Sequence, residues 1–108
     1  MMMTKHFQED RADRYAFIAT TIGIGKVVHS KTYEFDYVHN RAGSTINITN
    51  PGVAMIIAPD GTLITMYVLT LSEARRYFID KTVPMVLAAI IKKNMKNQYH
   101  ILQNEVKY

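Results

Sequence analysis

The stretch that most constrains this chain is GVAMIIAPDGTLITMYVL, which runs from Gly52 to Leu69. Two apolar runs, Val53–Ala58 and Thr62–Leu69, flank the tripeptide Pro59-Asp60-Gly61. An Asp-Gly pair between β-rich runs is typical of a hairpin, because glycine tolerates the positive φ that tight turns need. Both runs are apolar at nearly every position, which is typical of strands covered on both faces. We therefore expect this hairpin at the centre of a sheet.

The length of 108 residues indicates a single domain, residues 1–108. The domain should fold, because 48% of the residues are hydrophobic and only 20% are charged. The chain has no cysteine, which excludes disulfides, thiolate metal sites and a cysteine nucleophile. Its formal charge of +4 is compatible with nucleic acid or another acidic partner.

No signal peptide or membrane span is expected from the sequence. No apolar core follows the lysine of the first ten residues, MMMTKHFQED. The longest apolar run, Val83–Ile91, contains Pro84 and is too short to cross a bilayer. We expect a soluble, cytoplasmic protein without a membrane partner.

The first predicted element is a helix from Lys5 to about Thr21, followed by a turn at TIGIGK, residues 21–26. Charged residues are dense on this helix, and three interpretations stay open. They are a solvated face with local ion pairs, a functional His6 with two arginines, and a metal site of His6, Asp10 and Asp13. The Gly-x-Gly-Lys of the turn lacks the spacing of a nucleotide loop, so we interpret it as a helix-to-strand turn.

Two segments predict the remaining strands of a four-stranded antiparallel meander. In the first, Val27–His39, the aromatic residues Tyr33, Phe35 and Tyr37 alternate with polar residues, as in a half-buried strand. His29 and Lys31 share the parity of these aromatics. A turn is expected at residues 40–44, a second strand at Thr45–Thr49 with its isoleucines inward, and a tight turn at Asn50-Pro51-Gly52 before the hairpin.

After the sheet, the pattern predicts a short helix from Ser72 and a long helix from Thr82-Val83-Pro84 to about Asn104. The fold class is therefore α+β, with the helix and sheet in residues 5–69 and the C-terminal helices in residues 72–108. Three interpretations of the apolar stripe on the long helix stay open. It packs on its own sheet, it forms a homo-oligomer seam or docks a partner, or it lies on a membrane surface. The stripe consists of Leu87, Ile91, Met95, Tyr99, Leu102 and Val106.

The motif Lys5-His6-x-x-x-x-Arg11-x-x-Arg14, followed by a sheet that ends in a Gly-containing hairpin, resembles the DUF4258 family of small bacterial and phage proteins. The resemblance covers about Lys5 to Leu69. That family is similar in fold to RelE-like and other barnase-like toxin ribonucleases. Gly23 and Gly25 after the first helix depart from its pattern.

The resemblance implies RNA cleavage without a metal or other cofactor. Such chemistry needs an acid, a base and cations for the phosphorane charge. In this sequence, His6 is the expected acid or base, and Arg11 and Arg14 are the expected phosphate ligands. His29 and Lys31 contribute if the first strand lies beside the helix. Tyr33 and Tyr37 either stack on bases or pack in the core.

Two alternatives belong to other functional classes. The first is a non-enzymatic phage-type protein that binds and inhibits a host or defence protein, as a monomer or a homo-oligomer. The second is a nucleic-acid-binding accessory protein without catalysis, whose cations are Arg75, Arg76, Lys92, Lys93 and Lys96.

Overall fold

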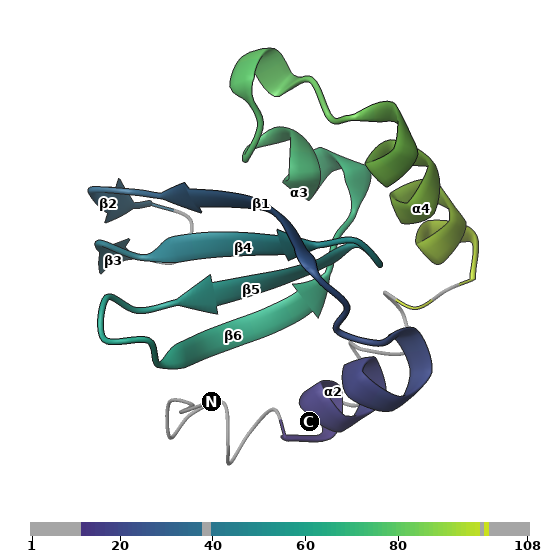
Figure 1. The fold of residues 1–108 in the computed structure, drawn as a ribbon, viewed down its shortest axis with the longest axis horizontal. Helices are drawn as coiled ribbons and strands as arrows, with labels where there is room; N and C mark the ends of the chain where they lie inside the picture. Colours follow the sequence, from purple (N-terminus) through teal and green to yellow (C-terminus); the bar gives the residue numbers. More distant parts are fainter. Residues whose placement is uncertain (1–11, 38–39, 98, 100–108) are drawn as a thin grey trace.

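The computed structural model describes residues 12–37, 40–97 and 99, and it confirms the predicted α+β class (Figure 1). An N-terminal helix precedes a four-stranded antiparallel sheet, and helices follow it. The elements in chain order are α2 (Ala12–Phe17), η1 (Ile18–Ile22), β1 (Val27–Thr32), β2 (Phe35–Asp36), β3 (Arg41–Ala42), β4 (Thr45–Thr49), β5 (Val53–Ile57), β6 (Leu63–Val68), α3 (Leu71–Arg75), η2 (Ile79–Lys81) and α4 (Met85–Lys96).

The strand order of the main sheet is β1-β4-β5-β6, with every neighbouring pair antiparallel. The predicted hairpin is present as β5 and β6, and its turn is held by the Ala58 amide, which donates to the Thr62 carbonyl at 2.9 Å. Gly61 adopts the positive φ, +89°, expected of this turn. The expectation that the hairpin lies at the centre of the sheet is only half right. Strand β6 is at the edge, and β4 and β5 are the inner strands, because β1 returns to pair with β4.

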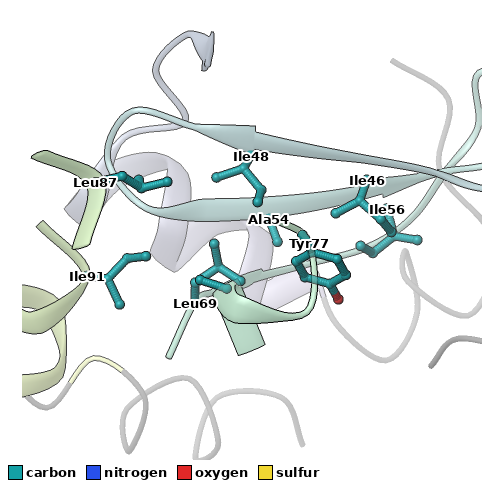
Figure 2. Close-up of a cluster of buried hydrophobic side chains, with 9 residues drawn as sticks. Ile46, Ile48, Ala54, Ile56, Leu69, Tyr77, Leu87 and Ile91 are labelled. Atoms are coloured by element: carbon teal, nitrogen blue, oxygen red, sulfur yellow. The ribbon is translucent and has the colours of Figure 1, made fainter. Parts of the chain in front are cut away.

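Both faces of the hairpin are covered, as its continuous apolar sequence predicts. On one face, residues of β4 and β5 pack against α3 and α4 (Figure 2). On the other face, residues of β5 and β6 pack against α2 and η1, with Ile18 fully buried. The cluster in Figure 2 consists of Ile46, Ile48, Ala54, Ile56, Leu69, Ala74, Tyr77, Leu87 and Ile91.

The first helix is described from Ala12, and the predicted part from residue 5 to 11 lies outside the described residues. Its last turn, η1, is a π-helix, and the Gly23 amide closes it by donating to the Ile18 carbonyl at 2.8 Å. The next residues form the predicted helix-to-strand turn. Asn50 holds this turn with two hydrogen bonds to Lys26. The side-chain Oδ1 of Asn50 accepts from the backbone N–H of Lys26 at 3.0 Å, and the backbone N–H of Asn50 donates to the Lys26 carbonyl at 2.8 Å.

The predicted strand from residue 27 to 39 is interrupted after Thr32, and its last two residues lie outside the described part of the chain. Of its aromatic residues, Tyr33 packs against the cluster of Figure 2, whereas Phe35 and Tyr37 are exposed. Strand β2 pairs instead with β3, inside the segment predicted as a turn. Phe35 is 38% exposed and Tyr37 is 87% exposed, whereas Asp36 between them is only 3% exposed. The Ser44 hydroxyl donates to Asp36 Oδ2 at 2.8 Å. This charge-assisted hydrogen bond favours the buried position of the carboxylate.

The N-cap of helix α3 is Thr70, two residues before the predicted start at Ser72. The Thr70 hydroxyl accepts from the Glu73 amide, and the Glu73 carboxylate accepts from the Thr70 amide at 2.8 Å. This reciprocal pair is a capping box.

Helix α4 follows Pro84 and is described from Met85 to Lys96; of the predicted continuation to about residue 104, Asn97 is a turn residue and Tyr99 is helical, and the rest lies outside the described residues. Its buried stripe is Leu87, Ile91 and Asn94, whereas Met95, predicted for this stripe, is 44% exposed. Asn94 occupies the inner face because its Nδ2 donates to the Pro51 carbonyl at 2.8 Å. For the described part of this helix, the interpretation in which it packs on its own sheet is confirmed; Leu102 and Val106 of the predicted stripe lie outside the described residues.

Candidate functional site

The residues predicted for RNA chemistry do not all fall within the described part of the chain. His6 and Arg11 lie outside it, as does Asp10 of the alternative metal site. Arg14 lies on α2 and is buried, at 7% exposure. The neighbouring α2 residues Tyr15 and Phe17 pack on the β5–β6 side of the sheet.

His29, Lys31 and Tyr33 lie on the opposite face from α2. His29 pairs with Ile48 and Lys31 pairs with Ile46, and both isoleucines face the cluster shown in Figure 2. Directly paired residues point to the same face of an antiparallel sheet. The expected common face of His29, Lys31 and Tyr33 is therefore confirmed, and the sheet separates these residues from α2.

His29 connects β1 to the segment after α3. Its Nε2 lies 2.8 Å from the carbonyl oxygen of Tyr77, and because a carbonyl only accepts, Nε2 is the donor. Its ring stacks on Phe78, with 4.1 Å between the ring centroids and an interplanar angle of 25°. These two contacts give His29 a structural role in holding the α3–η2 connection against the sheet.

Lys31 and Tyr33 form a cation–π pair, with Lys31 Nζ 5.1 Å from the centroid of the Tyr33 ring. Burial, with smaller contributions from Tyr77 and Asp36, raises the pKa of Tyr33 above its usual value. Tyr33 is therefore a neutral aromatic surface beside a cation near pH 7, and not a base.

A pair of tyrosines lies deeper under the helices. The Tyr67 and Tyr77 hydroxyl oxygens are 2.7 Å apart. Burial raises the pKa of both phenols, most strongly that of Tyr67. Both hydroxyls stay protonated at neutral pH, so this pair links β6 to the segment after α3 and provides no general base.

Arg75 and Arg76, predicted as nucleic-acid ligands, do lie together, and the structure adds Lys81 and Ser72 to them. These four exposed residues line a cleft of about 330 Å³. The capping box sets the start of α3 and therefore the position of both arginines. Asp80 and Lys81 then adopt left-handed backbone conformations, with φ of 56° and 57°, at the reversal that precedes α4.

The cleft lies in the most basic region of the chain. Residues 70–97 contain six lysines and arginines and two acidic residues, which gives a net charge of +4, equal to that of the whole chain. The remaining lysines of this region, Lys92, Lys93 and Lys96, are exposed on α4. Glu73, one of the two acids, is engaged in the capping box.

Among residues 12–37, 40–97 and 99, no three His, Asp or Glu side chains are placed to hold a metal ion. The same part of the chain contains no helix that is both long enough and apolar enough to cross a membrane.

Sequence reasoning found the two arginines but missed Lys81 and Ser72. The local sequence Ile-Asp-Lys gives no signal for two consecutive left-handed residues, which are uncommon outside glycine. Comparison with known proteins supplies no further assignment, since no protein family, curated protein or solved structure matches this chain.

Proposed function

We propose that this protein binds single-stranded RNA through the cleft of Ser72, Arg75, Arg76 and Lys81. The observation that carries the proposal is the convergence of three exposed cations and a hydroxyl on one cleft. Arginine presents a planar fork of donors that matches phosphate oxygens, and lysine adds a point charge. No acidic side chain lines this cleft.

The surrounding charge supports a polymeric anion as the ligand. The excess charge of residues 70–97 continues from the cleft segment onto α4, where Lys92, Lys93 and Lys96 are exposed. A phosphate backbone carries a charge at every nucleotide and can neutralise separated cations at once. Lys31 and Tyr33, on the same side of the sheet, add a cation beside an aromatic ring, the combination that favours stacking of unpaired bases.

Cleavage of the bound RNA would require more than binding does. We propose binding as the primary function, because the described residues provide cations for phosphate but no acid–base pair beside them. Metal-independent cleavage requires an acid–base pair at the phosphate. Of the predicted groups, Arg14 lies on the helix that covers the far side of the sheet, and His29 is bonded to a backbone carbonyl. Incubation with RNA in EDTA, with wild type beside His6→Ala, tests the cleavage: products that disappear only in the variant would establish it.

The binding test compares two variants that each remove two positive charges. Arg75→Ala/Arg76→Ala removes the cleft arginines, and Lys26→Ala/Arg41→Ala removes two exposed cations elsewhere. Affinity for a fluorescent single-stranded RNA is measured by anisotropy over a range of salt concentrations. We expect the cleft variant to lose at least about tenfold in affinity and to reduce the salt slope by about 1.4, the value for two fewer contacts.

The control variant is expected to retain most of the affinity. Equal losses in the two variants would mean that only net charge matters, and this result would overturn the cleft assignment. A folded wild-type protein that fails to bind RNA at low salt would refute RNA binding altogether. It would favour the alternative of a protein that binds a host or defence protein.

A further inference from the structure

Strand β1 is an edge of the main sheet, because β4 is its neighbour on one side and no described strand pairs with the other. The Tyr33 amide, just past the end of β1, donates inward to the Ser44 carbonyl at 2.9 Å. Since antiparallel strands alternate the direction of their backbone groups, Ser30 and Thr32 direct theirs outward. All residues of β1 are exposed except the half-buried His29. An accessible edge of this kind is a template for another strand.

Exposed apolar side chains gather at the two ends of this edge strand. Eight large hydrophobic residues of the described chain are at least 38% exposed, and six of them lie at these ends. Val27, Val28, Met85 and Val86 are at the start of β1, where α4 begins, and Phe35 and Tyr37 are just beyond its end. In Figure 1, α4 and β2 lie at opposite ends of β1.

The apolar group at the start of β1 surrounds a pocket of about 250 Å³. Its lining includes Val28, Phe78, Pro84, Val86 and Ile90, and contains no Lys, Arg, Asp or Glu. Val86 is nevertheless 76% exposed, and its neighbour in the chain, Met85, is 83% exposed. The start of β1 therefore offers an apolar hollow and protruding side chains, which can receive exposed apolar side chains of another surface.

We propose that a second copy of this chain pairs with β1, antiparallel, about a two-fold axis near Ser30. Two identical edge strands related in this way exchange donors and acceptors with each other. The axis also brings the apolar start of each strand to the far end of the other. Val86 of one copy then faces the exposed Phe35 and Tyr37 of the other, and the two main sheets become one of eight strands.

The size of the patch fits a dimer and favours a second copy over a small ligand. A six-residue strand provides an edge of about 20 Å. The apolar groups at both ends extend the patch from α4 to β2. A standard interface buries about 800 Å² on each partner, and a surface of this length has room for one, whereas a small ligand would occupy only the pocket. The buried stripe of α4 is used in its own core, so only the first turn of that helix takes part. This placement differs from a seam along the C-terminal helix.

Sedimentation equilibrium of the full chain, without RNA, tests the proposal. We expect wild type to be a dimer and Val86→Glu and Tyr37→Glu to dissociate it, with a rise of at least about tenfold in the dissociation constant. The matched control is Ile79→Glu, because Ile79 is 83% exposed but lies outside both apolar groups. All three positions are exposed, so circular dichroism should show an unchanged fold. A monomeric wild type, or equal dissociation by Ile79→Glu, would overturn the proposal.

Cross-linking checks the position of the axis independently of affinity, because the natural chain has no cysteine. Ser30→Cys places one thiol at the proposed axis, and Lys96→Cys places one at the end of α4. On oxidation we expect disulfide-linked dimers from Ser30→Cys only. Dimers from Lys96→Cys alone would locate the interface on the C-terminal helix and contradict pairing through β1.

Discussion

Gly25 is the position at which a single methyl group should be most informative about the turn between the first helix and the sheet. Its φ is +72°, and an added Cβ would collide with Asn50 Oδ1 and the ring of Pro51. Asn50 has little freedom to move away, because it is bonded twice to Lys26. Gly23, two residues earlier, has a φ of +87° but no atom within 4 Å of an added Cβ.

The two alanine variants therefore share backbone strain but differ in collision. Both variants place a Cβ at positive φ, in sparsely populated regions of backbone space that cost about 1–3 kcal/mol. Overpacking adds about 1–3 kcal/mol, which only Gly25→Ala should lose. We expect Gly23→Ala to destabilise the protein by about 1–3 kcal/mol and Gly25→Ala by about 2–6 kcal/mol.

Urea unfolding followed by far-UV circular dichroism measures both free energies of unfolding. Asn50→Ala provides a further check when it is combined with Gly25→Ala. Because it removes the side-chain oxygen but leaves Pro51 in place, Gly25→Ala should destabilise the Asn50→Ala protein less than it destabilises wild type, without becoming harmless. Equal stability of Gly25→Ala and Gly23→Ala would refute the packing argument. It would mean that the turn does not rest on Asn50 and Pro51.

Two further predictions concern the polar groups under the helices and at the end of the sheet. Ser44→Ala removes a hydrogen bond to the buried Asp36 and should lower the free energy of unfolding by about 1.5–3 kcal/mol. The control is Ser30→Ala, which removes an exposed hydroxyl and should have a much smaller effect in the same urea titration. Stability should also fall above about pH 10, because the unfolded tyrosines ionise there while burial, which raises the pKa of Tyr67 and Tyr77, keeps them protonated in the folded protein. Thermal melts at rising pH should show a smaller decline in Tyr67→Phe, and an equal decline in both proteins would contradict this reasoning.

The sequence by itself determined the elements whose signals are local. Asp-Gly between two apolar runs predicted the hairpin, and the alternation at Thr45–Thr49 predicted β4 with Ile46 and Ile48 inward. The order of helix, sheet and helices predicted the α+β class. These inferences hold because turn chemistry and side-chain periodicity depend on neighbouring residues and are retained whatever packs around them.

The tertiary structure alone decided which strands lie at the edges of the sheet. It also decided which of two neighbouring residues is buried where the local pattern favoured the apolar one. The aromatic pattern predicted Phe35 and Tyr37 inside, but the Ser44 hydroxyl favours Asp36 there. The stripe of α4 predicted Met95, but the Pro51 carbonyl favours Asn94. In both cases a hydrogen bond from a distant residue outweighs a local hydrophobic preference, because a buried polar group is stable only when it is bonded.

The candidate RNA site shows the same division. Arg75 and Arg76 are adjacent in the sequence and were predicted together. Lys81 joins them after a reversal that contains two left-handed residues, and no local signal marks that reversal. His29 was predicted as a catalytic group because it is ionisable and lies on a strand. Its contacts with Phe78 and the Tyr77 carbonyl depend on how the segment after α3 packs against β1. The sequence therefore determined which chemical groups the chain carries, and the packing of distant elements decided which of them meet.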